Sequence, residues 1–221
     1  MKDALALTQV LCTRLCHDLA GPVGAVAAGV ELVGGDPAAV DAETLQLIAN
    51  SSAAAARKLK FLRLALGTAG SAAALKDLQS TVAHYFEAIA GPSGPARVTW
   101  PAPDALAALG NVANGQGPQV LANLILVAGE SVPRLSGVVV TMAQNGAAIS
   151  VSAEARGDIS PNLDPRRDLL AVLAAPEAAT LSPKTVQALY AHALVGHYGG
   201  ALSAAATDGG LKATATLPSQ P

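Results

Sequence analysis

Apolar positions recur at three- and four-residue spacing over two long segments near the start of the chain, residues 3–33 and 41–66. This spacing is typical of amphipathic α-helices. Gly-Gly-Asp-Pro at residues 34–37 predicts the end of the first helix, and Gly67 predicts the end of the second, because Gly and Pro interrupt helices. Two long helices joined by a short turn predict an antiparallel hairpin. A lone hairpin leaves apolar surface uncovered, so we expect two copies to pair as a homodimeric four-helix bundle.

After Gly67 the pattern changes to a mixture of helices and strands. Helices are predicted at residues 75–90, 117–130, 164–173 and 182–198, and strands at residues 97–100, 138–143, 147–155, 201–206 and 211–217. Gly-containing turns at 144–146 and 208–210 predict two β-hairpins. The fold class is therefore α+β, with the helical hairpin followed by an α/β sandwich. We divide the chain into a hairpin domain (1–68), a linker (69–74) and a sandwich domain (75–221).

The first helix carries the most informative side chains. Wound at ~100° per residue, one side of it presents Arg14, His17, Asp18, Gly21, Ala25 and Ala28. The other side presents Leu11, Leu15, Leu19, Val23 and Val26. His17 therefore projects from the wetter face, and Gly21, one turn further on, leaves open space beside the ring. Pro22 cannot donate to the carbonyl of Asp18, so a kink just past His17 is expected.

The sequence Arg-Leu-Cys-His-Asp-Leu-Ala-Gly-Pro-Val-Gly-Ala at residues 14–25 resembles the phospho-acceptor box of two-component signalling proteins. It resembles most closely the box of the ChpT-type histidine phosphotransferases. The resemblance implies that His17 carries a phosphoryl group and that the protein is a homodimer. Asp18 then orients the ring or takes its proton, and Gly21, Gly24 and Ala25 form a shelf for a partner. The same small residues could instead pack inside the dimer.

A basic cluster on the second helix is predicted to lie near this box. If the hairpin turn centres on Pro37, residues 57–60 face the level of His17, which brings the cations Arg57, Lys58, Lys60 and Arg63 towards it. These cations are either a solvated basic face or a means of offsetting phosphoryl charge and meeting an acidic partner. We assign Lys58 and Arg63, with Arg14, to a partner-binding surface.

Residues 119–128 and 197–218 resemble the ATP-binding domain of histidine kinases, including its asparagine-box helix. Val127 stands where that box carries its second Asn, which holds Mg²⁺, and valine cannot bind a hard cation. Residues 156–161 lack the Asp-x-Gly-x-Gly motif that reads adenine. We therefore expect no ATP binding and no cofactor. The family resemblance implies that Mg²⁺ is held by the receiver partner.

Composition narrows the remaining classes. The 221 residues are 51% hydrophobic with a net charge of −2 and a pI near 6.0, which argues against nucleic acid as a partner. Polar residues and Pro118 interrupt the longest uncharged stretch, 105–129, so no membrane partner is expected. The first residues lack a signal-peptide pattern, and a cytoplasmic location is expected. Cys12 and Cys16 are interpreted as half-buried packing residues without a metal.

The favoured function is that of a histidine phosphotransferase in a phosphorelay. His17 receives a phosphoryl group from a receiver-domain aspartate of a hybrid histidine kinase and passes it to the aspartate of a response regulator. An ATP-dependent kinase is not expected. Two alternatives stay open: a pseudokinase scaffold that binds receivers without phosphoryl transfer, and a divergent histidine kinase.

Overall fold

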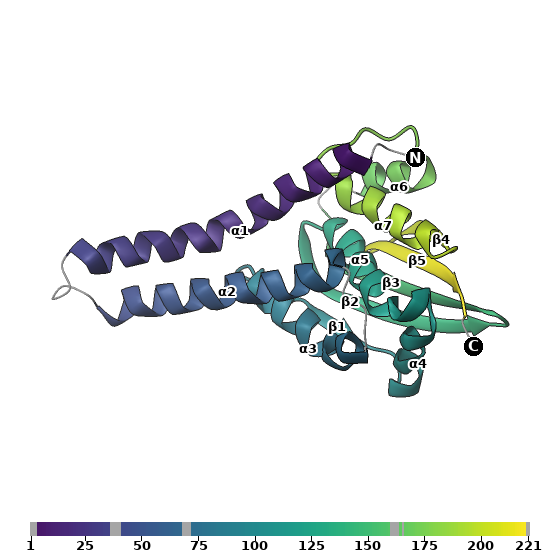
Figure 1. The fold of residues 1–221 in the computed structure, drawn as a ribbon, viewed down its shortest axis with the longest axis horizontal. Coiled ribbons are helices and arrows are strands. Elements are labelled where there is room, and N and C mark those ends of the chain that lie inside the picture. The colour runs from purple at the N-terminus through teal and green to yellow at the C-terminus, as the bar shows by residue number, and fades with distance from the viewer. Residues whose placement is uncertain (1–3, 36–40, 68–71, 160–163, 165, 220–221) are drawn as a thin grey trace.

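The computed structural model describes residues 4–35, 41–67, 72–159, 164 and 166–219. Its two long helices are α1 (Ala4–Gly35) and α2 (Ala42–Leu66), and α3 (Ala72–Ala88) follows them. The remaining α-helices are α4 (Pro103–Ala107), α5 (Gly117–Glu130), α6 (Arg166–Ala174) and α7 (Val186–His197). The strands are β1 (Arg97–Thr99), β2 (Arg134–Asn145), β3 (Ala148–Asp158), β4 (Ala201–Thr207) and β5 (Gly210–Pro218). The α+β class and the predicted hairpin are confirmed (Figure 1).

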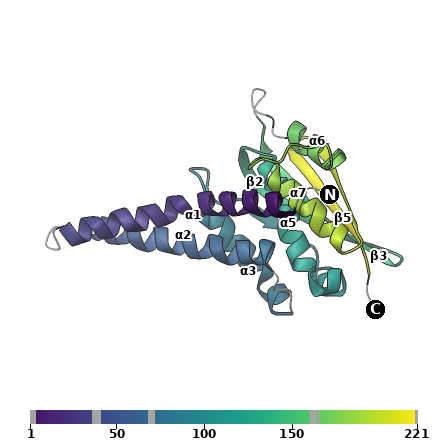
Figure 2. The same cartoon turned by 45° about the horizontal axis from the view of Figure 1, so that its top comes forward.

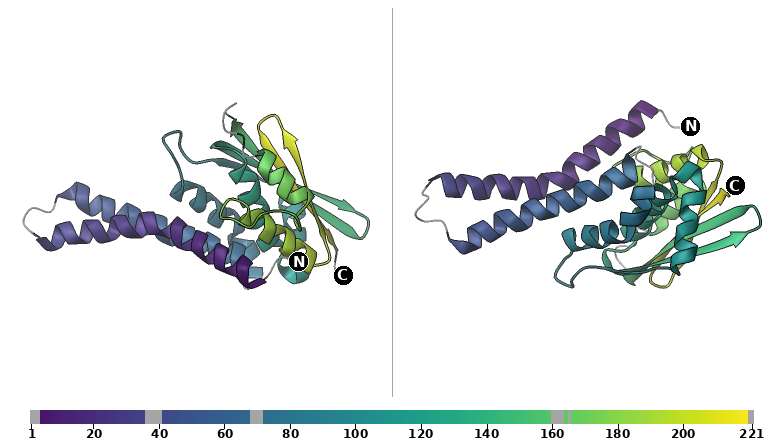
Figure 3. Two further views of the ribbon diagram at one scale, coloured as in Figure 1. Left: turned by 90° about the horizontal axis from the view of Figure 1, so that it is seen from above. Right: turned by 60° about the horizontal axis from the view of Figure 1, so that its bottom comes forward.

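The helical hairpin projects from one side of the α/β unit, with the start of α1 and the end of α2 at its base (Figure 1). Asp41 caps α2, because its carboxylate accepts a hydrogen bond from the Thr44 amide at 2.7 Å. α1 is continuous through Pro22 and bends about midway along its length (Figure 3). Gly29 of α1 packs directly against Ile48 of α2, since an added Cβ would lie 2.4 Å from Ile48 Cγ1.

A five-stranded sheet in the order β1-β2-β3-β5-β4 forms the second layer. β1 pairs with β2 in parallel and every other pair is antiparallel. Alternate residues of β3 and β5 are buried beneath α5, and α7 packs against β4 (Figure 2). On the opposite face the same strands carry a Ser and Thr ladder, in which Ser152 and Thr214 hydroxyls lie 2.8 Å apart. The sheet therefore buries one face and leaves the other polar.

Three amide side chains, those of Gln119, Asn123 and Gln187, join the hairpin to this unit and are called the amide joint below. The Asn123 amide donates to the Ala65 carbonyl at 2.7 Å, and the Gln119 amide donates to the Gly67 carbonyl at 2.6 Å. Gln187 of α7 donates to Asn123 Oδ1 at 2.6 Å, and all three side chains are buried. The last carbonyls of a helix have no partner within it, so α5 provides donors for the end of α2, and α7 in turn binds the Asn123 side chain of α5. Phe61 and Ala65 of α2 belong to the same apolar core as the sheet.

Several predicted boundaries differ from the structure. α3 begins at Ala72, inside the segment that we assigned to the linker. α7 begins at Val186 rather than at residue 182, because the Thr185 hydroxyl binds the Ser182 amide and the Thr180 carbonyl and closes a separate turn first. The predicted turn around Pro37 lies outside the described residues. Cys12 and Cys16 are exposed, so their interpretation as packing residues was wrong.

Within the described ranges, no helix combines the length and apolar character that crossing a membrane requires.

We predict that Asn123→Ala lowers the free energy of unfolding by about 2–4 kcal/mol, because buried polar groups of α2, α5 and α7 lose their partner. Urea unfolding followed by circular dichroism measures this loss. Asn50→Ala on exposed α2 surface is the matched control and should change stability by less than about 0.5 kcal/mol. Equal effects of the two substitutions would contradict a special role for the amide joint.

Candidate functional site

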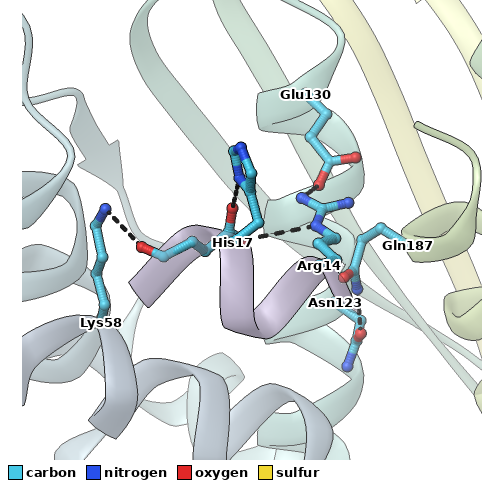
Figure 4. Close-up of polar contacts among 7 residues, drawn as sticks. Arg14, His17, Lys58, Asn123, Glu130 and Gln187 are labelled. Carbon is cyan, nitrogen blue, oxygen red and sulfur yellow. Dashed lines mark hydrogen bonds and ion pairs between the residues drawn. The ribbon is translucent and has the colours of Figure 1, made fainter. Parts of the chain in front are cut away.

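His17 lies in the middle of α1, just before the bend. Its side chain is 89% exposed, and the ring projects away from the helix (Figure 4). The Nδ1 atom faces the carboxylate of the next residue, at 3.6 Å from Asp18 Oδ1. Because one ring nitrogen faces Asp18, the other nitrogen, Nε2, is left to meet a partner from solvent.

Lys58 contacts the helical turn that carries His17 through a backbone carbonyl. Pro22 has no amide hydrogen to donate to the carbonyl of Asp18. The Lys58 ammonium donates to that carbonyl instead, at 3.3 Å (Figure 4). The sequence predicted the level of Lys58 correctly, but its contact is with the chain itself. Lys58 therefore supplies a donor at the point where the proline interrupts the helix.

Arg14 is half-buried and pairs with a residue of the α/β unit. Its side chain is 20% exposed and donates to the carboxylate of Glu130, the last residue of α5 (Figure 4). Arg14 Nε also lies 3.7 Å from Asp18 Oδ2. Burial raises the pKa of Glu130, and Arg14 offsets part of that rise. Burial by itself would lower the pKa of Arg14, but the charge and hydrogen bond of Glu130 outweigh it and the pKa is raised.

A cleft of about 850 Å³ opens beside His17. One wall is α1, and the other is built from α6 and the turn before α7. Its lining residues are Thr13, Arg14, His17, Asp18, Glu130, Asp164, Asp168, Leu169, Pro183 and Lys184. No local pattern in the sequence connects the last six of these residues, from Glu130 to Lys184, with His17. Only the packing of the chain brings residues so distant in sequence together.

The shelf beside His17 is open in the structure. Gly21 and Gly24 are exposed, and a Cβ added to either would have no other atom within 4 Å. Ala25 is half-buried. Gly29 behaves differently, because it is buried against Ile48 in the hairpin. Within this chain, Gly21 and Gly24 are thus not required for packing of α1 on α2.

The other predicted cations point elsewhere. Arg57 Nη1 lies 3.1 Å from Glu87, and Lys60 Nζ lies 3.7 Å from Asp77, so both pair with α3. The prediction that Arg57 and Lys60 approach His17 was wrong, because they form ion pairs with carboxylates of α3 instead. Arg63 is exposed on α2 and does not line the cleft.

Val127 of α5, which stands where the histidine-kinase box carries its second Asn, faces the interior. Val127 is fully buried in the apolar core, and Asn123, one turn earlier, is committed to the amide joint. Residues 156–158 lie in β3. Over the described part of the chain, no cluster of three or more His, Cys, Asp or Glu side chains is arranged to hold a metal ion.

The protein thus combines a long helical hairpin, which carries an exposed histidine, with an α/β unit. Residues 76–210 match the family model described as the histidine phosphotransferase C-terminal domain, and the chain belongs to this family. The matched segment starts after the hairpin, so the role of His17 depends on the geometry and on the resemblance of residues 14–25.

Comparison with a curated relative agrees with the family. The chain is 32% identical over 135 residues to the protein phosphotransferase ChpT of Brucella abortus (strain 2308). That match covers 60% of this chain and 58% of the relative, so it spans less than two thirds of the Brucella protein. The resemblance to ChpT-type histidine phosphotransferases is confirmed.

A solved structure described as a bacterial phosphotransferase shares the fold. Its TM-score is 0.68 at 23% sequence identity, and the superposition covers 97% of this chain and 98% of that one. The hairpin and the α/β unit thus occur together in that structure too.

We predict that Lys58→Met weakens the helical turn around Asp18 and Pro22. Methionine keeps the apolar stem of the lysine but leaves the Asp18 carbonyl without its donor. Hydrogen–deuterium exchange should become faster in peptides covering residues 15–25, and the free energy of unfolding should fall by about 1 kcal/mol. Lys60→Met, which removes the same charge from an exposed pair with Asp77, is the control. Identical exchange in both variants would contradict the assigned role of Lys58.

Proposed function

We propose that this chain is a phosphorelay intermediate and that His17 is its phosphoryl acceptor. The observation that carries the proposal is the exposed imidazole of His17, at the rim of a cleft and beside two glycines with open space around them. A group that must meet the aspartate of another protein needs such access. The family membership supports phosphotransfer as the activity.

The transfer can be written with the residues at hand. Neutral His17 carries its proton on Nδ1, facing Asp18, and attacks the phosphorus of an aspartyl phosphate through Nε2. The bond from phosphorus to the aspartate oxygen breaks, and the partner's carboxylate leaves. Asp18 stabilises the phosphoimidazolium, whose Nδ1 still carries the proton. Attack by a second receiver's aspartate reverses these steps.

The partners that we propose are receiver domains, one from a hybrid histidine kinase and one from a response regulator. Their backbone would lie on the shelf of Gly21, Gly24 and Ala25. We propose no nucleotide or metal of the chain's own, since Val127 offers no ligand and Asn123 is engaged in the joint. Mg²⁺ belongs to the receiver in this proposal, and the chain acts in the cytoplasm.

We also propose that two copies associate through the hairpin. Val23 and Val30 of α1, seven residues apart, are exposed, and so are Leu45 and Leu59 of α2, fourteen apart. Such spacing places the members of each pair on one face of their helix. Pairing these faces with those of a second copy forms a four-helix bundle and removes the apolar surface from water.

Transfer to His17 is the direct test. Purified protein is mixed with a radiolabelled phospho-receiver after removal of ATP. We expect acid-labile, base-stable label on the wild type and none on His17→Gln, since glutamine has no nucleophilic ring nitrogen. Receiver binding that survives in both proteins without any label transfer, from a donor active on another phosphotransferase, would favour the scaffold alternative. Label from ATP alone would favour the divergent kinase.

Gly21→Leu separates the shelf from the dimer. We expect at least tenfold slower transfer, because leucine fills the space beside His17, while light scattering still gives the mass of a dimer. Gly34→Leu, at an equally open position far along α1, should transfer normally. Loss of the dimer in Gly21→Leu would assign this glycine to packing between the two copies.

A further inference from the structure

The carboxylate of Glu130 stands where a helix least favours one. It is the last residue of α5, at the negative end of the helix dipole, and burial already raises its pKa. Tyr85 and the carboxylate of Asp18 lie near it. Arg14 could bind the free carbonyls at this helix end without any acid. The stability of α5 therefore does not require a glutamate here, and the role of Glu130 lies in its contact with Arg14.

Glu130 fixes the direction of Arg14, and Arg14 lies against the acceptor. The Arg14 guanidinium binds Glu130 with one terminal nitrogen, while Nε lies 3.7 Å from Asp18 Oδ2. The other oxygen of Asp18 lies 3.6 Å from His17 Nδ1. A series of four charged or titratable side chains thus leads from the end of α5 to the ring that we propose to be phosphorylated (Figure 4).

The start of this series is rigid and its end is free. α5 is buried from Gly117 to Ala128 and is tied to α2 by Gln119 and Asn123. His17, by contrast, is almost fully exposed. Without a fixed neighbour, its ring would sample its rotamers in solvent. Arg14 gives Asp18 a fixed neighbour, because Glu130 holds the guanidinium from the opposite side.

We propose that Glu130 is a positioning residue for phosphoryl transfer, acting through Arg14 to hold the Asp18 carboxylate at His17 Nδ1. This proposal rests on the proposed function of His17. Glu130 touches neither the phosphoryl group nor the receiver's aspartate. It sets the orientation and the proton position of the ring, so its loss slows transfer without weakening the docking of the receiver.

The test compares Glu130→Gln, Arg14→Gln and the double variant with the wild type, using transfer from a labelled phospho-receiver at saturating concentration. Glutamine keeps the shape of Glu130 without its charge, and at Arg14 it removes the guanidinium that contacts Glu130 and Asp18. In the double variant neither residue leaves a buried charge unpaired, so a folded protein is available even if one single variant is unstable. Asp77→Asn, an exposed acid on α3, is the control and should transfer normally. Receiver affinity is measured separately with unphosphorylated receiver.

We expect Glu130→Gln to slow maximal transfer at least tenfold with receiver affinity changed less than twofold. The double variant should be no slower than Arg14→Gln, because Glu130 acts only through Arg14. Wild-type transfer rates in Glu130→Gln would overturn the proposal, and so would losses that multiply in the double variant. Weakened receiver affinity at an unchanged maximal rate would assign Glu130 to docking and overturn it as well. If the wild type itself takes no label, it is the proposed function that fails.

Discussion

The carbonyl groups at the end of α2 need donors from outside their own helix, and the rest of the structure depends on how they obtain them. Gln119 and Asn123 of α5 bind these carbonyls, and Gln187 of α7 binds Asn123. Each buried amide without its partner would cost free energy. Because hydrogen bonds have direction, this joint sets the angle of the hairpin more strictly than apolar contact alone. The angle of the hairpin in turn sets where α1 passes the cleft.

The joint uses an asparagine that the sequence placed in a box resembling that of histidine kinases. In this chain both the nitrogen and the oxygen of the Asn123 amide form hydrogen bonds within the protein, and Val127 lies in the core. The polar side chains of α5 therefore connect secondary-structure elements rather than face a ligand. A helix of the same apparent pattern can serve either purpose, and only the neighbours of its polar groups distinguish the two.

Local features of the sequence predicted most of the elements but few of the contacts between them. The bounds of α5 and the presence of both β-hairpins followed from apolar spacing and from glycine-containing turns, since these signals are local. The strands of the first hairpin are longer than predicted, and β2 begins at Arg134 rather than at residue 138. The start of α7 was misplaced because a hydroxyl-bonded turn precedes it. The position of Lys58 opposite the acceptor could be predicted from the length of the hairpin. Its actual bond, to a carbonyl that Pro22 leaves free, needed the coordinates.

The site shows the same limit more sharply. His17, Asp18 and the open glycines could be found from a single helix, because their relation is one of helical periodicity. Glu130 and the α6 wall of the cleft could not, since they lie more than a hundred residues away and carry no motif of their own. We had assigned Arg14, which lies on the face of α1 that carries His17, to a partner-binding surface. Its pairing with Glu130 depends on the approach of α1 to α5, which no local pattern encodes.

In the function that we propose, His17 exchanges a phosphoryl group with two partners, so its ring must be open to both and must present the same orientation to each. The structure meets these requirements with different residues. Access comes from the exposed ring and from Gly21 and Gly24, which add no side chains. We attribute a constant orientation of the ring to the residues behind it. Lys58 binds the Asp18 carbonyl, and Arg14 Nε lies 3.7 Å from the Asp18 carboxylate. Because Arg14 pairs with Glu130 of α5 and α5 is bound to the end of α2, the chain itself builds the surroundings of His17 on this side.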